Sequence, residues 1–570
     1  MERQPYLSVR AFRVFLGASI LTALSAMLGN VVDGIIVSHL IDYNAMSATS
    51  LGKPIIQAYY TVYQLVGLGG SVLVAKAMGA GDMARANRIF STNAMVLVAF
   101  GAVMLLVGAF FVDNVVQLMC SNPELHDYAR QYFRPLLLGA VSFMGVYFLG
   151  GYTAIDGAPR LVSAAMITDN LVNLGMDYVM VKYLEMGVTG SSVATVIGHV
   201  VACCILLTHY AGDRTKYRFS FSRWSHLGES CSTGLPFAVA SVCMTVYLYA
   251  TQFIIGHHLG ADALFVFSVV LNIMALYNMF ISGACSTMQQ LAALQLGLND
   301  YYGHRTTVSS AFRFLNTSLG TVCVLLLCFP QGVAGMFDCP DRLLPECCYS
   351  IRIYSVAFWL FCLLYLLMVN YKLLQRTALA NVISFSLNLS VIPVIWLMAV
   401  LVPQLVWWSN LVAYGLVLLA ALALSAAVRR RDKTLRPVSL LPTVLPFPTY
   451  DRSFRYSLET MNQTFEEITR WLTVRRLPEE TVFRVRVVAE ELMANIAEHG
   501  HRRSRKAFID VRLLVQPEQV ILSLADDSPP FNPVENKDKG IGLKIANGEA
   551  SHISYKFQFG QNITTVTVAT

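Results

Sequence analysis

The chain has 570 residues, of which 55% are hydrophobic and only 14% are charged, and its mean hydropathy is +0.54. Soluble domains carry about 25% charged residues, so this composition excludes a wholly soluble protein and indicates that most of the chain lies in lipid. The formal net charge of +7 is weak support for a nucleic-acid partner, because Lys and Arg are placed by membrane topology, and we expect no nucleic acid among the partners.

The chain up to about Val428 is a succession of apolar runs, each near 20 residues or longer. A helix needs about 20 apolar residues to cross a bilayer, and the runs of this sequence predict twelve spans. Their approximate centres are Ala26, Tyr63, Gly101, Val141, Asn170, Ala202, Tyr247, Ala275, Val322, Leu360, Leu387 and Val417. The first run, from about Phe12 to Leu40, is long and contains Asp33, so we interpret it as a true span and not as a signal peptide.

Lys and Arg are concentrated in every second loop, and this pattern predicts the orientation of the chain in the membrane. These loops carry Lys76, Arg85, Arg88, Arg160, Arg214, Lys216, Arg218, Arg223, Arg305, Arg313, Lys372, Arg376 and the cluster from Arg429 to Arg436. The opposite loops are poorer in Lys and Arg and carry Asp42, Glu124, Asp262, Asp338 and Asp341. Because cytoplasmic loops hold the excess of positive residues, we expect both termini in the cytoplasm.

A weak internal repeat divides the apolar part in two. A shift of about 218 residues places Ala45 on Ala263, Gly79 on Gly297 and Asp82 on Asp300. We therefore predict a six-helix lobe at residues 1–218, a second at residues 219–430, a linker at residues 431–448 and a cytosolic domain at residues 449–570. The predicted fold is an all-α polytopic membrane protein followed by an α+β sandwich, with a substrate path between the two lobes.

An unusual group of polar residues lies inside the fifth apolar run, where the sequence from Ile167 to Val179 reads ITDNLVNLGMDYV. An acid at mid-membrane costs roughly 2.5–3.5 kcal/mol on insertion scales. Asp169, Asn173 and Asp177 are spaced by four, so they share one helix face. Such a stripe indicates an aqueous cavity or a bound ion; the alternative is a hydrogen-bonded contact between helices of the bundle.

Four segments carry a resemblance to a known family: GNVVDGIIVSHL, KAMGAGDMARANR, AIDGAPR and MDYVMVKYLEMGVTGSSVAT. With the loop GAGD and its echo GLND, they resemble the multidrug and toxic compound extrusion (MATE) family over about residues 10–430. The resemblance implies a sodium or proton site formed by Asp33, Asn173, Asp177 and Thr195. All four present oxygen, which suits a hard cation, and protonation of an Asp serves a proton cycle equally well.

The mechanism that this resemblance implies is antiport. Cation binding in the first lobe promotes outward release of an amphiphilic organic cation or drug, and the two lobes alternate in access. Aromatic and Met side chains that attract flat cations are candidates for the cavity lining, although for each one taken singly ordinary packing or an interfacial position is the better explanation. These are Tyr59, Tyr60, Tyr63, Met274, Tyr277 and Met279, with Gln289 and Gln290 as polar candidates. The expected location is the plasma (inner) membrane of a prokaryote.

Beyond the basic, Pro-rich linker, about 120 residues remain, enough for one small α+β domain. Predicted strands are Arg452–Leu458, Ala507–Val515, Gln519–Asp526, His552–Phe559 and Asn562–Val568, and predicted helices are Glu459–Arg475, Pro478–His499 and one starting at Gly542. Three motifs follow one another on this frame: VAEELMANIAEHG, LADDSPPFNP and KGIGLKIAN. They place an acid and an amide on one helix face, an Asp at a strand end, and free backbone N–H groups at a helix start that suits phosphate.

Together these motifs resemble the ATP-binding domain of histidine kinases, gyrases and chaperones, with the anti-sigma-factor serine kinases as the nearest branch. The resemblance implies Glu491 as general base, Asn495 as magnesium ligand and Asp526 as adenine reader. It places Gly540 and Gly542 beside the phosphates of ATP. In one departure, Ser528 stands where the family usually has Gly, and it narrows the space beside the base.

Three functions stay open at this point. The first is a sodium- or proton-coupled exporter with a nucleotide-binding regulatory tail. The second is a lipid-linked saccharide flippase of the same superfamily, which more often has Lys and Arg inside its spans than this chain does. The third is a membrane-tethered sensor whose tail phosphorylates a cytosolic protein partner on Ser or Thr. Alternatively, the tail is a degenerate fold that binds a partner and no nucleotide.

Overall fold

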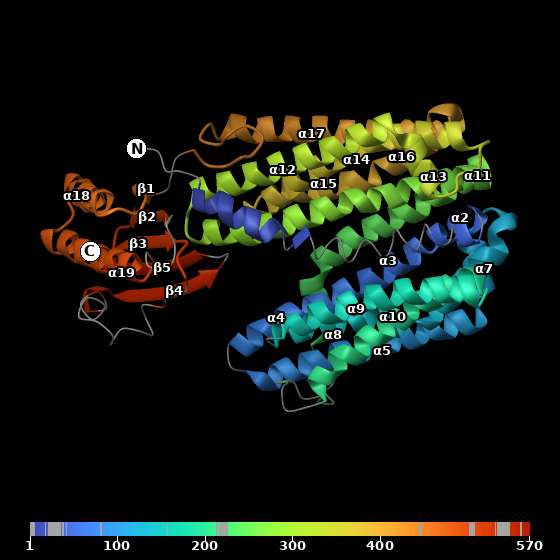
Figure 1. Cartoon of the computed structure of the whole chain (residues 1–570), viewed down its shortest axis with the longest axis horizontal. Helices are drawn as coiled ribbons and strands as arrows, with labels where there is room; N and C mark the ends of the chain where they lie inside the picture. Colours follow the sequence, from blue (N-terminus) through green and yellow to red (C-terminus); the bar gives the residue numbers. More distant parts are fainter. Residues whose placement is uncertain are drawn as a thin grey trace.

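The computed structural model describes residues 6–17, 19–20, 36, 39–41, 43–79, 82–156, 158–211, 215, 226–443, 447–500, 508–529, 532, 546, 548–558 and 561–570. A large helical part is followed by a small domain built on a sheet, which lies at one end of the helices (Figure 1). Below, this small domain is called the tail, the helix ends beside it the tail end, and the opposite ends the far end.

The helical part consists of two groups of helices (Figure 1). The first group contains α2 (Tyr43–Leu51), α3 (Lys53–Val62), η1 (Tyr63–Leu68), α4 (Gly69–Gly79), α5 (Met83–Phe110), α6 (Val112–Met119), η2 (Pro123–Leu125), α7 (His126–Leu138), α8 (Ala140–Ile155), α9 (Pro159–Tyr178), η3 (Val179–Tyr183) and α10 (Gly187–Tyr210). The second contains α11 (Leu227–Gly297), α12 (Tyr301–Cys328), α13 (Pro330–Met336), α14 (Leu344–Leu373), α15 (Thr377–Leu389), α16 (Val391–Leu401), η4 (Pro403–Trp408) and α17 (Ser409–Arg431). The first half of α11 also packs on α3, η1 and α4, so it joins the two groups.

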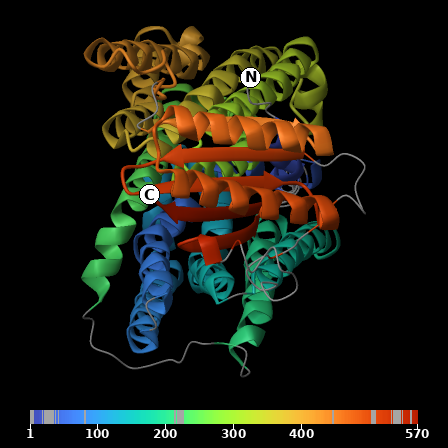
Figure 2. The same ribbon diagram turned by 90° about the vertical axis from the view of Figure 1, so that its left-hand side faces the viewer.

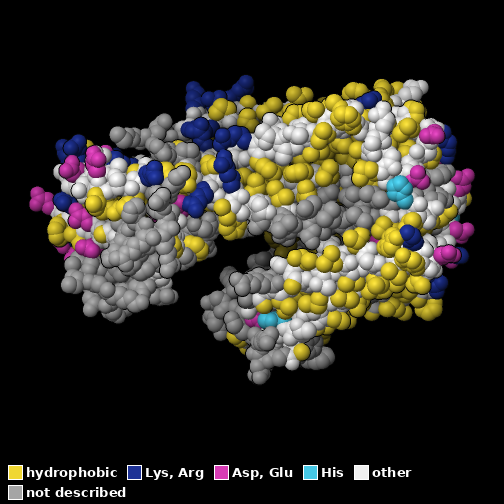
Figure 3. Space-filling model, in the orientation of Figure 1, with side chains coloured by type: hydrophobic (Ala, Val, Ile, Leu, Met, Phe, Trp, Pro, Cys, Tyr) yellow, Lys and Arg dark blue, Asp and Glu magenta, His cyan; other side chains and the backbone are white. Residues whose placement is uncertain are grey.

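Among the described residues, seven helices are long and apolar enough to cross a membrane, or eight if the bent pair Pro123–Leu138 and Ala140–Ile155 is one span. The longest helix, α11, is two helices joined at Gly260, whose φ of 86° lies in the left-handed region that favours glycine. Hydrophobic side chains cover the visible faces of both groups (Figure 3). This surface suits contact with lipid, and the structure is that of a multi-pass membrane protein.

The repeat seen in the sequence has a structural counterpart at two helix starts. Asp82 accepts a hydrogen bond from the Arg85 backbone N–H at 2.9 Å, and Asp300 accepts one from Gly303 at 2.8 Å. Each Asp is therefore the N-cap of a helix of 28 residues, with nearly equal backbone angles of −87° and 75° for Asp82 and −85° and 77° for Asp300. The matched acids of GAGD and GLND thus cap equivalent helices in the two groups.

The tail has a five-stranded antiparallel sheet in the order β1-β2-β3-β5-β4. Its elements are β1 (Thr449–Arg455), α18 (Leu458–Val474), α19 (Glu479–Gly500), β2 (Phe508–Val515), β3 (Gln519–Asp526), β4 (His552–Gln558) and β5 (Gln561–Ala569). The predicted type, helix or strand, is correct for each of these elements, although β1 begins three residues earlier than expected. The start of the helix predicted at Gly542 lies outside the described residues. Figure 2 shows α18 and α19 on the face of the sheet turned away from the membrane part.

The opposite face of the sheet packs on the membrane part. In β2, alternation should leave every second residue exposed, yet Asp510 and Arg512 are only 6% exposed. Arg512 donates hydrogen bonds to the backbone carbonyls of Leu298, at 3.1 Å, and Asn299. Its guanidinium also lies 3.7 Å from Asp300, so one Arg contacts the GLND loop and the cap of α12.

The N-terminal helical segment, residues 6–17, forms the other side of this junction. The ring of Tyr6 stacks on Phe508 with centroids 4.0 Å apart, and Gln561 donates to the Leu7 carbonyl at 2.7 Å. Arg10 forms an ion pair with Asp527. The tail therefore contacts both the second helical group and the segment that leads into the first apolar run.

We expect Asp82→Ala and Asp300→Ala to lower the thermal stability of the purified protein, because each leaves helix N–H groups without a cap. Such a loss typically costs about 1 kcal/mol, and Asp300→Ala should cost more because it also removes a carboxylate beside Arg512. Thermal unfolding in detergent would measure both. Asp82→Asn, which keeps a capping oxygen, should behave as the wild type, and equal melting temperatures for all variants would contradict the capping role.

Candidate functional site

The buried polar stripe lies on the seam between α9 and α10. Asn173 of α9 donates a hydrogen bond from Nδ2 to Thr195 Oγ1 of α10 at 3.1 Å. Asp177, one turn along α9, is fully buried. The structure thus brings Asn173 and Thr195 together, with Asp177 beside them on the same helix face. Asp33 lies outside the described residues, so its place in the site stays a prediction.

The outer face of α9 has the opposite character. Leu171 is 64% exposed and Ile167 is 48% exposed, as expected of side chains that contact lipid. Asp169 and Asp177 are 7% and 0% exposed. The prediction that the stripe turns away from lipid is confirmed for this helix.

A partner for Asp169 is present that the sequence analysis missed. His199 Nδ1 lies 3.0 Å from Asp169 Oδ1, and because an ionised carboxylate only accepts, the imidazole N–H donates this bond. His199 follows Thr195 by four residues, so helical spacing alone would have placed both on one face of α10. The His199 ring also packs edge-on against Phe143, with centroids 4.3 Å apart.

Gly198 explains how the two helices come so close. A Cβ atom at Gly198 would lie 2.6 Å from Asp169 Oδ1 and 3.3 Å from the Cβ of Asn173. Any side chain at this position would separate the helices and break the polar contacts on either side. A second buried pair, His209 Nε2 and Asp156 Oδ2 at 2.9 Å, joins α10 to the end of α8.

A cavity of about 470 Å³ lies between the two helical groups. Its lining comes from α3, η1, α11, α14 and α15 and consists of Gln57, Gln64, Ala240, Ser241, Met244, Met274, Asn278, Ile281, Ser282, Cys285, Ser286, Gln289, Phe361, Tyr365, Met368, Lys372, Ser384, Leu387 and Asn388. Met274 and Gln289 of the predicted lining are present. Tyr277 is instead fully buried beside Phe358, so packing accounts for it. The side chain of Gln290 lies outside the described residues.

The remaining aromatic candidates are also packed away from this cavity. Tyr59 and Tyr63 are buried, and Tyr60, Tyr63 and Tyr147 form a cluster with ring centroids 5.3 to 5.9 Å apart. Met279 is buried as well and does not line the cavity. For Tyr59, Tyr63 and Met279, close packing was the better interpretation, whereas Tyr60 is 36% exposed.

The cavity extends toward the tail end, and α11 contacts the first group at both ends of the helices. Lys372, in the last turn of α14, is part of the lining. At the far end, Gln252 of α11 donates to the Ser50 carbonyl at 2.8 Å, and Tyr249 donates to that of Leu118 at 2.9 Å. At the tail end, Arg85 of α5 pairs with Glu229 of α11 at 2.8 Å. The start of α11 thus joins the first group on the tail side as well, and the cavity lies beside this contact.

In the tail, Asp526 ends β3 and is 2% exposed. Its Oδ1 accepts hydrogen bonds from the Ser528 N–H and Asn562 Nδ2, both at 2.9 Å, and from the Ser528 hydroxyl. Burial raises the pKa of Asp526, and the bonds from Ser528 and Asn562 offset only part of this effect. Its Oδ2 accepts no hydrogen bond from the described residues. One oxygen is thus fixed and the other is free to accept from an amine such as that of adenine.

Glu491 and Asn495 lie one turn apart on α19, and both are half-buried. Asn495 Nδ2 donates to the Glu491 carbonyl at 2.7 Å, which leaves the side-chain oxygen of Asn495 as the atom suited to a cation. The α19 helix packs on β3, the strand that ends at Asp526. Gly540 and Gly542 lie outside the described residues. The three residues for which the family resemblance implies the roles of base, metal ligand and adenine reader are thus carried by two neighbouring elements.

Comparison with known proteins agrees with both parts. Residues 18–179 match the MatE family, and residues 454–569 match the histidine kinase-like ATPase domain. The multidrug export protein MepA of Staphylococcus aureus (strain MRSA252) is 19% identical over 419 residues, which cover 72% of this chain and 91% of that protein. MepA of Staphylococcus saprophyticus is 20% identical over 401 residues, or 69% of this chain and 88% of that protein.

Solved structures are similar to the helical part as well. An inward-facing MATE family multidrug resistance transporter superposes with a TM-score of 0.64 and 18% identity, covering 72% of this chain and 99% of its own. The MATE multidrug transporter DinF-BH, solved as a complex, gives a TM-score of 0.61 and 21% identity, covering 77% and 99%. The helical part therefore has the fold of the MATE transporters. The chain thus carries a region that matches the MatE family, in a helical part with the MATE transporter fold, followed by a C-terminal region that matches the histidine kinase-like ATPase domain.

We expect a coupling between Asp169 and His199 in stability. His199→Leu should lower the free energy of unfolding by about 1–3 kcal/mol, because it leaves a buried carboxylate without its donor. The double variant Asp169→Leu/His199→Leu should lose less than the sum of the two single losses. Unfolding of the purified protein in mixed detergent micelles would measure this cycle. Strictly additive losses would show that the two side chains do not interact.

Proposed function

We propose that this chain is a secondary-active antiporter of the plasma membrane that exports amphiphilic organic cations in exchange for protons or sodium ions. The observation that carries the proposal is the buried polar seam of α9 and α10 beside a cavity between two helical groups. Intramembrane acids are expensive, and they mark ion or proton pathways when they face the interior. The multidrug export function named for the MepA relatives supports the same class of substrate.

The proposed architecture is twelve spans in two lobes of six, with both termini in the cytoplasm. The matched N-caps Asp82 and Asp300, each before a 28-residue helix, support an internal repeat. The kink at Gly260 divides α11 into two helices and raises the number of candidate spans accordingly. Lys and Arg gather where the second group meets the tail (Figure 3), which fits a cytoplasmic tail end.

In this proposal the described arrangement is the one open to the cytoplasm. The cavity would take up substrate from the tail end, which its lining reaches at Lys372 in the last turn of α14. Binding of a cation at Asp177, Asn173 and Thr195, with Asp33, would change the packing of α9 against α10. Rocking of the groups would then break the far-end contacts and release substrate outward.

His199 favours the proton as the coupling ion. Its imidazole can carry a proton and lies 3.0 Å from the carboxylate of Asp169. Protonation of Asp169 would remove the acceptor charge to which His199 donates and would weaken the link between α9 and α10. Sodium is the alternative, and the oxygen atoms of Asn173, Asp177 and Thr195 are suited to it.

We expect Asp177→Asn to reduce efflux from proteoliposomes at least about tenfold, because it removes the charge on which cation coupling depends. A fluorescent organic cation would be followed while pH and sodium gradients are imposed separately. Asp341→Asn, a change at an exposed acid of the loop before α14, is the matched control and should transport normally.

Efflux that follows neither gradient, or survives Asp177→Asn with Asp33→Asn, would contradict the antiport proposal. Such a result would favour the flippase alternative. Its cavity needs cationic groups for a pyrophosphate, and Lys372 is the one such group among the described residues that line the cavity.

For the tail, we propose an ATP-binding domain that regulates transport. Asp526 with its available Oδ2, Asn495 and Glu491 fit the adenine, the magnesium ion and the base position of the family, so the residues present suit the nucleotide. ATP with magnesium supplies a transferable phosphoryl group, and Glu491 would take the proton from an attacking hydroxyl. A Ser/Thr kinase acting on a cytosolic protein partner is therefore the second candidate function.

Regulation is proposed because the proposed nucleotide site and the residues through which the tail contacts the membrane part are neighbours in the chain. Asp527, which pairs with Arg10, directly follows Asp526. Arg512 joins the same sheet to the GLND loop. A change at Asp526 on nucleotide binding would thus reach the N-terminal segment and the end of α11 through contacts that already exist.

We expect ATP to change the efflux rate of the wild type and to leave that of Arg512→Ala unchanged. Arg512→Ala should still bind ATP, since Arg512 is remote from Asp526 in the β2–β3 register, whereas Asp526→Ala should lose both binding and regulation. Nucleotide binding and efflux would be measured on the same preparations. Arg470→Ala, an exposed change on α18, should behave as the wild type. A wild-type ATP response in Arg512→Ala would contradict the proposed route.

A further inference from the structure

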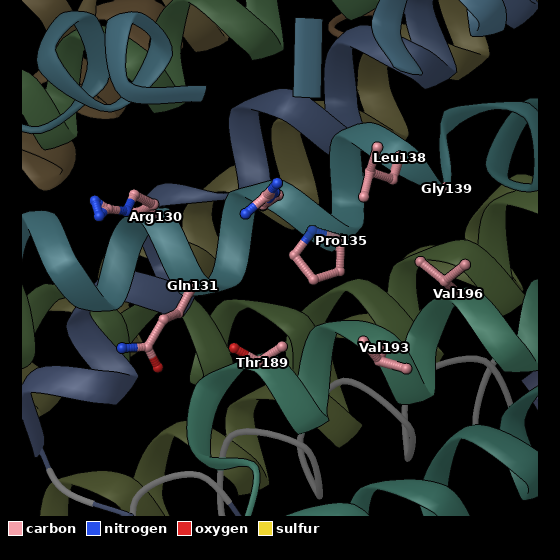
Figure 4. A pocket seen from close by; sticks show the side chains of 9 residues that line it. Arg130, Gln131, Pro135, Leu138, Gly139, Thr189, Val193 and Val196 are labelled. Atoms are coloured by element: carbon pink, nitrogen blue, oxygen red, sulfur yellow. The ribbon is translucent and has the colours of Figure 1, made fainter. Parts of the chain in front are cut away.

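A groove of about 460 Å³ opens between α7 and α10, away from the polar seam (Figure 4). Its lining consists of Arg130, Gln131, Arg134, Pro135, Leu138, Gly139, Thr189, Val193 and Val196. The transport mechanism proposed above uses none of these side chains.

The groove results from a bend in the chain. Pro135 lies inside α7, and α7 and α8 meet at an angle of 47°. At the bend, a Cβ atom on Gly139 would lie 2.4 Å from Val196 Cγ2. Only glycine lets the bend contact α10 so closely, and space remains between α7 and the first turns of α10.

The two ends of the groove differ in character. Arg130 and Gln131 lie toward one end, while Leu138 and Val196 lie toward the other, with Thr189 and Val193 on the facing helix (Figure 4). A ligand that fits both ends carries a negative or strongly polar group next to an extended apolar chain.

The charges at the polar end are only partly compensated within the protein. Arg130 Nε lies 3.6 Å from Asp113 Oδ1, but both side chains are about half exposed or more, so this pair is weak. Arg134 forms no hydrogen bond or ion pair with any residue that the structure describes. Its guanidinium therefore has donors available for an external anion.

The groove also lies at a suitable depth. α7 lies at the far end of the helical part (Figure 1), and Thr189 is in the first turn of α10. Arg side chains near the ends of spans extend toward the level of the lipid headgroups. Leu138, which is 40% exposed, faces the region of the acyl chains from the same helix.

We propose that this groove is a binding site for an anionic phospholipid. Arg134, with Arg130 and Gln131, holds the headgroup phosphate, and one acyl chain lies along Leu138, Val193 and Val196. A guanidinium matches a phosphate through two parallel hydrogen bonds, and the apolar end excludes a fully polar ligand. Bound there, the lipid would join α7 to α10 on the side opposite to the seam with α9.

The test is retention of lipid by the purified full-length protein, measured by native mass spectrometry with phosphatidylglycerol or phosphatidylcholine added in equal amounts. The wild type should retain phosphatidylglycerol preferentially, and Arg134→Gln should weaken this retention about fivefold. Arg352→Gln is the matched control. Arg352 is also exposed near the far end, but it already donates to the Leu327 carbonyl at 3.2 Å.

Further variants and a competing ligand separate binding of a lipid from binding of a headgroup alone. Val193→Trp fills the apolar end without changing charge and should also reduce retention, whereas Arg134→Lys should restore part of it. Glycerol phosphate, which has the headgroup chemistry without chains, should compete poorly. Competition by glycerol phosphate as strong as by the lipid would reassign the groove to soluble phosphoesters, and equal retention by wild type and Arg134→Gln would overturn the proposal. Melting curves in phosphatidylcholine would confirm that each variant is folded.

Discussion

The close approach of α9 and α10 is the constraint on which the rest of the first helical group depends. Buried polar groups in a membrane need partners within the protein, because lipid offers none. Asp169 with His199 and Asn173 with Thr195 supply these partners to one another, and Gly198 gives them the necessary proximity. The resulting seam is a structural link that also contains the oxygen-bearing side chains of the proposed cation site. A change in the charge of one group must therefore change helix packing as well.

The two ends of the helical part are held differently. At the far end, hydrogen bonds join the groups directly, as Gln252 does with Ser50. At the tail end, Glu229 at the start of α11 pairs with Arg85 and a cavity lies beside this contact. The tail is attached there to the second group and to the N-terminal segment through Arg512, Tyr6 and Arg10. This asymmetry gives the tail a direct mechanical connection to the elements that border the opening. It is the physical reason for assigning the tail a regulatory role in preference to an independent one.

The tail shows how a soluble fold adapts to such a connection. One face of its sheet is covered by α18 and α19 in the ordinary way. The second face, which alternation would leave in water, buries Asp510 and Arg512 against the membrane part. A buried Arg is tolerated because backbone carbonyls of the GLND loop accept hydrogen bonds from its guanidinium and because the carboxylates of Asp300 and Asp451, 3.7 and 3.5 Å away, compensate its charge. The contact is polar, so it is specific in register and sensitive to changes in charge.

The sequence by itself determined the membrane character, the inward face of α9 and the types of the tail elements, and it placed Asn173 and Thr195 in one predicted site. The first three follow from local composition and from helical and strand periodicity, which depend only on neighbours in the chain. The placement of Asn173 and Thr195 in one site follows from the family resemblance. The tertiary structure alone decided that Asp169 contacts His199, that Arg512 docks on the GLND loop, and that Tyr277 packs in the core and not in the cavity. Periodicity says which residues share a face, but not which distant segment that face meets. That choice is made by packing between segments tens to hundreds of residues apart, where a glycine such as Gly198 or Gly139 sets how closely two helices approach.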